Sequence, residues 1–162
     1  EIPSDKILMG IPNYGYDWTL PFVKGESMAR KITIDDGSAI AESYGAEVLY
    51  EKTGIQYQPF NTIYQLMALK QEHPEQLKEA KWMLMIPEYL NYKLTGIKQN
   101  EYTNATSTNL VNAHTKTWDD EILDALGYPK ELFHPLAMPG TILGPLSEAV
   151  EKEVGTTDAL GI

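Results

Sequence analysis

Two kinds of hydrophobic pattern divide the chain near residue 60. Before this point the apolar positions form short continuous runs at 6–11 and 47–50, which are typical of strands buried on both faces of a parallel sheet. Between the runs, Asp35 or Asp36 could cap a helix that ends before Gly45. The order of strand, long loop, helix and strand predicts an α/β fold.

After residue 60 the apolar positions follow a helical spacing. Capping boxes, first-turn prolines and terminal glycines mark where these helices begin and end. The sequence therefore predicts a mixed α/β domain that is helix-rich after residue 60. The first two expected helices are one at 62–73 with a Thr62/Gln65 capping box and one from Pro74 to Ala80. A third runs from Pro87 to Gly96 with an apolar face of Tyr89, Leu90 and Leu94. A fourth follows a Thr117/Asp120 capping box with Ile122, Leu123 and Leu126 buried, and a fifth at 147–154 stops at Gly155.

Length and composition fit one compact domain, because 162 residues of which 43% are hydrophobic can fill a core. The net charge of −10 argues against nucleic acid and anionic membranes as partners. The chain has no cysteine, which excludes disulfides and thiolate chemistry and agrees with a reducing compartment. It also has no signal peptide pattern and no run near ~20 apolar residues, so a cytoplasmic location is expected.

An aromatic and acidic cluster follows the first predicted strand. The string Gly10-Ile11-Pro12-Asn13-Tyr14-Gly15-Tyr16-Asp17-Trp18 resembles the penultimate barrel strand of family 18 glycoside hydrolases, especially the branch found in spore-coat and germination proteins, and residues 39–50 resemble it too. The resemblance implies a piece of a (β/α)₈ barrel, in which residues beyond a strand's carboxyl end face the substrate. It thereby implies sugar-contacting positions at Tyr14, Tyr16, Asp17 and Trp18. A structural alternative is a turn beside two packed aromatic rings.

A longer set of motifs lies between residues 50 and 155. The strings are Tyr50-Glu51-Lys52-Thr53-Gly54, Ile86-Pro87-Glu88-Tyr89-Leu90-Asn91-Tyr92-Lys93-Leu94-Thr95-Gly96, Glu101-Tyr102-Thr103-Asn104-Ala105-Thr106-Ser107-Thr108 and Met138-Pro139-Gly140-Thr141. They resemble the FGGY carbohydrate kinases, closest to rhamnulokinases. The resemblance implies part of the N-terminal half of an actin-like, ribonuclease-H-like kinase, which phosphorylates a ketose with ATP and Mg²⁺.

Neither resemblance brings its catalytic residues. The hydrolases' Asp-x-x-Asp-x-Asp-x-Glu strand is absent, and glycoside hydrolysis needs a positioned acid. Kinases of this family resemble one another in an Asp-Thr-Gly motif, but here Asp158 is followed by Ala159. We therefore expect no catalytic residue, no metal ligand and no cofactor in this chain.

The two resemblances together predict a chimera-like chain. Its expected segments are a hydrolase-like part at 1–50, a kinase-like part at 51–155 and an unassigned tail at 156–162. The expected function is that of a rhamnulokinase-like kinase fragment that is inactive alone. The alternatives are a chitinase-like hydrolase fragment or a non-catalytic carbohydrate-binding or scaffold chain, with a small carbohydrate as ligand and self-association left open. Because an unpaired strand exposes backbone donors and acceptors, the strand at 6–11 is expected to share a sheet with the second segment or to pair with another chain.

Other polar residues have ordinary structural interpretations. The three histidines, His73, His114 and His134, are scattered, which disfavours a metal site. The acidic run 119–121 fits the first turn of a helix better than a cation site. The glycosylation-like string 104–106 is interpreted as a turn.

Overall fold

The structure, a computed structural model, describes residues 45–56, 58 and 60–155, together with the backbone of three short strands in the first segment. These strands are β1 (Ile7–Gly10), β2 (Tyr16–Trp18) and β3 (Ala29–Lys31). The expected helix at 35–44 lies outside the described residues.

The first strand belongs to a sheet that it shares with the second segment. β1 pairs in parallel with β4 (Trp82–Met85), in a register that places Ile7 opposite Trp82 and Gly10 opposite Met85. The prediction that this strand shares a sheet with the second segment is confirmed. β2 pairs with β3 in the antiparallel sense.

The expected piece of a (β/α)₈ barrel is not seen in the described part of the chain. Its sheets have two strands each, and β1 pairs there with a strand of the kinase-like segment. A short apolar run with polar and aromatic residues at its carboxyl end suits the parallel strands of several α/β folds. The string at 10–18 therefore cannot distinguish a barrel from an open sheet.

Helices make up most of the remainder, as predicted. α3, α4, α5 and α8 begin and end close to the expected residues, with Gly96 and Gly155 in left-handed conformation behind α5 and α8. The strand expected at 47–50 is wrong, because these residues lie in a helix that ends at the left-handed Gly54. The helices are α2 (Ala46–Thr53), α3 (Thr62–Glu72), α4 (Pro74–Glu79), α5 (Ile86–Thr95), α6 (Tyr102–Thr106), α7 (Asp120–Leu126) and α8 (Glu148–Val154), with a 3₁₀ turn at Lys130–Leu132.

Both expected capping boxes are wrong in detail. The N-cap of α3 is Asn61, while Thr62 points its hydroxyl to the Met85 sulfur and Gln65 donates to the Phe60 carbonyl at 3.0 Å. The N-cap of α7 is Asp119 rather than Thr117. In both cases the N-cap residue, Asn61 or Asp119, has a side chain that also bonds to another segment of the chain. The local sequence does not reveal that contact.

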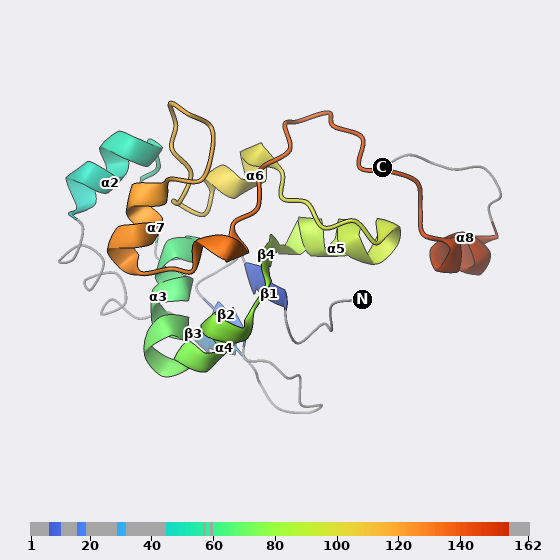
Figure 1. The fold of residues 1–162 in the computed structure, drawn as a ribbon, viewed down its shortest axis with the longest axis horizontal. Helices are drawn as coiled ribbons and strands as arrows, with labels where there is room; N and C mark the ends of the chain where they lie inside the picture. Colours follow the sequence, from blue (N-terminus) through green and yellow to red (C-terminus); the bar gives the residue numbers. More distant parts are fainter. Residues whose placement is uncertain are drawn as a thin grey trace.

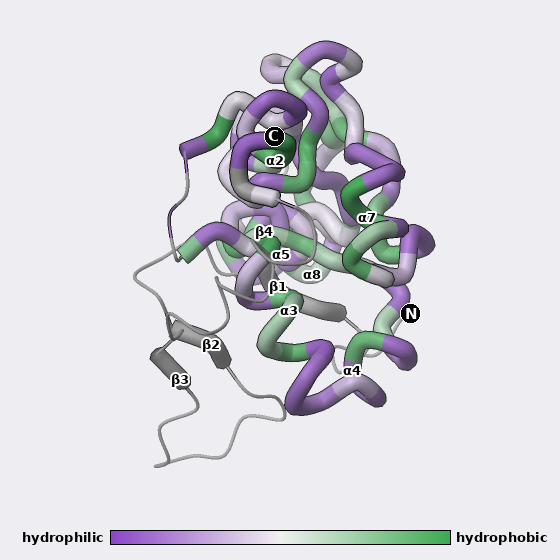
Figure 2. The backbone as a smooth tube through the Cα atoms, turned by 90° about the vertical axis from the view of Figure 1, so that its left-hand side faces the viewer, coloured by the Kyte–Doolittle hydropathy of each residue, from purple (hydrophilic) through white to green (hydrophobic). Residues whose placement is uncertain are grey.

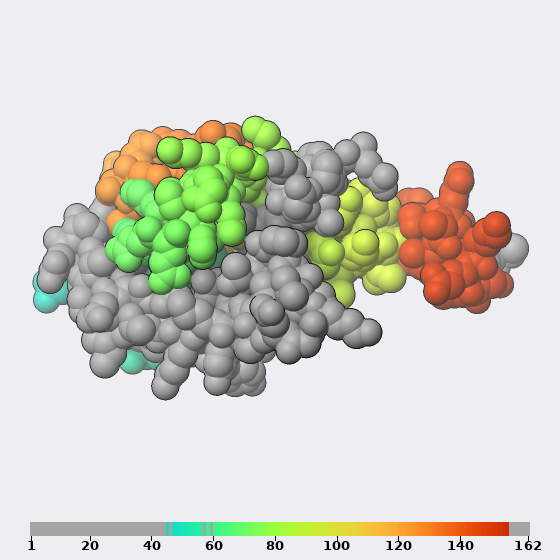
Figure 3. Space-filling view, turned by 90° about the horizontal axis from the view of Figure 1, so that it is seen from below, coloured from blue at the N-terminus to red at the C-terminus, as the bar shows by residue number. Residues whose placement is uncertain are grey.

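The core lies between β4, α3 and α7. Fully buried apolar side chains come from all three elements, among them Ile63, Met83 and Ile122. α2, α3, α4 and α7 gather on one side of the β1–β4 pair, and α5 and α8 extend from the other (Figure 1). α4 carries mostly hydrophilic residues and lies at the edge of this body (Figure 2). α8 has no buried residue and forms a projection beside α5 (Figure 3). No helix in the described ranges is long and apolar enough to cross a membrane.

Candidate functional site

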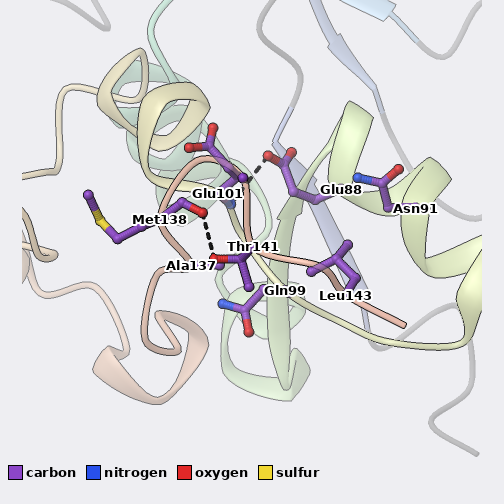
Figure 4. Close-up of a pocket in the computed structure, with 9 residues that line it drawn as sticks. Glu88, Asn91, Gln99, Glu101, Ala137, Met138, Thr141 and Leu143 are labelled. Carbon is purple, nitrogen blue, oxygen red and sulfur yellow. Dashed lines mark hydrogen bonds between the residues drawn. The ribbon is translucent and has the colours of Figure 1, made fainter. Parts of the chain in front are cut away.

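A cavity of about 230 Å³ opens where β4 ends and α5 begins. Two carboxylates, two amides and a hydroxyl line it together with apolar groups (Figure 4). In open α/β sheets, ligands bind beyond the carboxyl ends of the strands. The lining residues are Glu88, Asn91, Gln99, Glu101, Ala137, Met138, Gly140, Thr141 and Leu143.

Glu88 is the most deeply placed of the polar groups. Pro87 occupies the start of α5, where its missing N–H is not needed, so Glu88 falls in the first helical turn. Its side chain is only 3% exposed. The Asn104 Nδ2 donates to both of its carboxylate oxygens, at 3.0 and 2.8 Å, and the Glu101 backbone N–H donates to one of them at 3.4 Å.

Glu101 is the N-cap of α6. Its carboxylate accepts from the backbone N–H groups of Thr103 at 2.9 Å and Asn104 at 3.1 Å, and from the Thr103 hydroxyl. These bonds satisfy N–H groups that have no partner within the helix. Glu101 therefore uses its side chain to begin α6 and its backbone to reach Glu88.

Asn100 joins this segment to the sheet. Its side chain is buried, donates to the Met83 carbonyl at 2.8 Å and accepts from the Met85 N–H at 3.4 Å. On its other side, the Ala137 N–H donates to the Asn100 carbonyl at 2.9 Å, and the Tyr102 N–H donates to the Ala137 carbonyl at 2.8 Å. The far wall of the cavity is thus tied to β4 through hydrogen bonds.

The two carboxyl groups differ in acidity. Burial raises the pKa of Glu88, and the negative charge of Glu101 acts in the same direction, while hydrogen bonds from the Glu88 backbone N–H, from Asn104 and from the Glu101 N–H offset these effects in part. Burial also opposes ionisation of Glu101, but the hydrogen bonds from Thr103 and Asn104 outweigh it and lower the pKa. Glu88 therefore holds a proton at a pH where Glu101 is already charged. An ionised carboxylate such as that of Glu101 can accept hydrogen bonds from hydroxyl groups of a ligand.

A second cavity of about 240 Å³ lies beside the start of α7. Its carboxylates are engaged within the protein. Asp119 caps α7 through bonds of 3.0 Å from the N–H groups of Glu121 and Ile122, accepts from Asn112 Nδ2 at 2.8 Å and lies 3.5 Å from the Lys52 ammonium. Burial opposes its ionisation, but these contacts outweigh it and lower its pKa. The interpretation of this acidic run as the start of a helix is confirmed.

The sugar-contacting residues expected from the sequence have no described side chains. Tyr14 lies outside the described residues, and Tyr16, Asp17 and Trp18 form β2, of which the backbone alone is described. Their role in sugar contact stays a prediction.

The histidines stand apart from one another in the described structure. His134 stacks on Trp82, with ring centroids 3.4 Å apart, and His73 lies 3.6 Å from a Glu75 oxygen. Across residues 45–56, 58 and 60–155, no group of three or more His, Cys, Asp or Glu side chains is arranged to hold a metal ion.

Sequence reasoning missed the linked pair Glu88 and Asn104. The string 104–106, expected as a turn, forms the end of α6, and the Asn104 amide is engaged by Glu88. One signal could have found Glu88, which follows an apolar run and a helix-starting proline and so lies at the carboxyl end of a buried strand.

Comparison with known proteins identifies the relatives of this chain. The model of the N-terminal domain of the FGGY family of carbohydrate kinases matches residues 30–161. A rhamnulokinase of Halalkalibacterium halodurans is 44% identical over 96% of this chain and 34% of its own length. A rhamnulokinase of Oceanobacillus iheyensis is 50% identical over 67% of this chain and 23% of its own length. The crystal structure of a gluconate kinase from Lactobacillus acidophilus matches with a TM-score of 0.71 and 31% identity, over 78% of this chain and 26% of that one.

These matches confirm the kinase resemblance and the actin-like, ribonuclease-H-like fold class that it implied. They do not support a hydrolase segment or a chimera. A rhamnulokinase match over 96% of the chain must include most of residues 1–50. The chain spans about a third or less of the length of the curated relatives described above.

Proposed function

Because the chain belongs to the FGGY family of carbohydrate kinases, we propose that it serves the ATP-dependent phosphorylation of a ketose of the rhamnulose type, as part of an N-terminal kinase domain. The observation that carries this proposal is the 44% identity to a rhamnulokinase, which extends over nearly the whole chain. The family implies ATP and Mg²⁺ as cofactors of the complete kinase.

The cavity at the end of β4 suits the sugar side of such an enzyme. Its polar lining is rich in oxygen acceptors, and a ketose offers several hydroxyl donors. Glu101 contributes a carboxylate, and Asn91 contributes an amide that can both donate and accept. The role of this chain in the kinase is thus to shape a polar pocket.

By itself the chain is proposed to be inactive. Phosphoryl transfer requires a nucleotide, a metal ion and a base to be positioned together. The described residues hold no cluster suited to the metal. Purified chain incubated with ATP and L-rhamnulose should release no ADP above a heat-killed control, and turnover above that control would contradict this part of the proposal.

The rhamnulokinase assignment is tested by exchange of segments. This chain replaces the matching third of the rhamnulokinase of Halalkalibacterium halodurans, to which it is 44% identical. The exchanged enzyme should release ADP with L-rhamnulose at a kcat/KM within about tenfold of the parent, a loss of about 1.4 kcal/mol in transition-state stabilisation. D-xylulose is the matched control substrate and should react more slowly.

Two results would count against the assignment. A folded exchanged enzyme without turnover would show that the chain cannot serve this kinase. A preference for D-xylulose would show that it belongs to another branch of the family. Thermal unfolding of parent and exchanged enzyme establishes that each is folded before the rates are compared.

A further inference from the structure

One buried carboxylate connects two helices at the edge of the sheet. Glu88 sits in the first turn of α5, and the groups that donate to it, Glu101 N–H and Asn104 Nδ2, flank the start of α6. Asn104 Nδ2 contacts both oxygens of the carboxylate, at 3.0 and 2.8 Å. The contact therefore fixes the orientation of the Asn104 amide toward the Glu88 carboxylate as well as the distance between them.

The donors are neutral, which makes the contact sensitive to the charge on Glu88. Among the described residues no Lys, Arg or His forms an ion pair with Glu88, and the charged group that acts on it is the neighbouring Glu101 carboxylate. A buried charge without a cation is held by hydrogen bonds alone. A glutamine at this position would keep the shape but turn an NH₂ group toward the NH₂ of Asn104.

We propose that Glu88 is a positioning residue of the kinase, whose buried carboxylate holds the Glu101–Asn104 segment against the carboxyl end of β4 and so sets the wall of the sugar pocket. The inference rests on the proposed function for its link to catalysis. Its structural half, the hold on the Glu101–Asn104 segment, can be measured on this chain alone.

The geometry favours positioning over simple packing. Asn100 already ties the same segment to β4 by bonds to Met83 and Met85, so the segment does not need Glu88 in order to stay in the core. Glu88 adds a second attachment one residue further along, at the point where the chain begins to line the cavity. Removal of this attachment should leave the fold and loosen the pocket wall.

The first test is an NMR titration of the 162-residue chain. The chemical shifts of the Asn104 side-chain NH₂ protons and of the Glu101 backbone N–H should change with pH. The midpoint of this change should equal the midpoint measured from the chemical shift of the Glu88 carboxyl carbon. That midpoint should lie above the ordinary range of a glutamate carboxyl, because burial raises the pKa of Glu88. In Glu88→Gln the shift of the Asn104 protons should disappear, and in the matched control Glu131→Gln it should remain.

Asn104→Ala covers the case in which Glu88→Gln does not fold. This variant keeps the carboxylate, so the Glu101 N–H should still follow the Glu88 titration. Asn104 protons that are insensitive to the state of Glu88 in the parent, or a Glu101 N–H insensitive to it in Asn104→Ala, would overturn the proposed contact.

The second test uses the segment-exchanged kinase. Glu88→Gln should raise KM for L-rhamnulose by about tenfold or more while the KM for ATP stays within about twofold, since small displacements of a pocket wall have effects of this size. Asn104→Ala should have a similar effect, and the double variant should lose no more than the larger single loss, because both residues act through one contact. Glu131→Gln should match the parent.

The outcomes separate the two proposals. If the segment-exchanged kinase is inactive without any further substitution, the proposed function is refuted, and the NMR result alone decides the Glu88 contact. If the exchanged enzyme is active, the positioning role requires a selective change in the KM for L-rhamnulose. A Glu88→Gln variant that changes only kcat, only thermal stability, or both KM values equally refutes that role.

Discussion

The helices α7 and α5 carry similar apolar patterns but bury opposite kinds of side chain. In α7, Ile122 and Leu123 are buried at 0% and 1% exposure. In α5, Leu90 is 56% exposed, whereas Glu88 and Thr95 are buried. Both polar groups have partners, since Thr95 bonds to the Asn91 carbonyl at 2.8 Å and Glu88 bonds to Asn104. A helical pattern thus predicts the helix, but the face that is buried depends on partners from other segments.

The comparison predicts its largest effect for truncation of the apolar stripes. Ile122→Ala should lower the free energy of unfolding by about 2–5 kcal/mol, because it leaves a cavity in the core. Leu90→Ala, the matched change on α5, should alter it by no more than about 0.5 kcal/mol, because that side chain is already exposed to water. Urea denaturation of the two variants measures the difference. Equal losses would show that the α5 stripe is covered in solution.

A smaller difference is expected at the helix starts. Asp119→Ala should cost about 0.5–2 kcal/mol, because it removes the cap that accepts from Glu121 and Ile122. Ser147→Ala at the start of α8 should change little, because the Ser147 side chain makes no capping hydrogen bond.

The Asp119 effect should depend on pH. The pKa of Asp119 is lower in the folded protein than in the unfolded chain. Between these two pKa values, Asp119 therefore binds fewer protons in the folded state than in the unfolded state. Its stabilising contribution is therefore complete above the unfolded pKa and is lost as the pH falls through the folded pKa. The gap between parent and Asp119→Ala should narrow in acid, and a gap that widens in acid would contradict the assignment.

The elements best predicted from the sequence are those whose signals are local. Pro74 and Pro87 lie in the first turns of α4 and α5, and Gly127 follows α7 in left-handed conformation, as expected. These residues act through their own backbone preferences, which neighbours do not alter.

The missed features depend on residues far away in sequence. Val48 and Tyr50 suggested a strand, but the segment forms α2, where both are exposed and Leu49 is buried. A short apolar run cannot show whether a pairing strand exists for it. Glu88 was missed in the same way, because its burial depends on Asn104, sixteen positions later. The site thus depends on contacts between distant segments, whereas most of the helices depend on local sequence.

The central claim is that the first segment and the second form one body of the kinase type. Backbone NOEs in a deuterated, ¹⁵N-labelled sample of the chain test it most directly, because paired strands lie ~4.8 Å apart. The account predicts cross-strand NOEs in parallel register that join Leu8 to Met83 and Met9 to Leu84. Assigned strands without such NOEs, or with β1 paired only within residues 1–50, would contradict it.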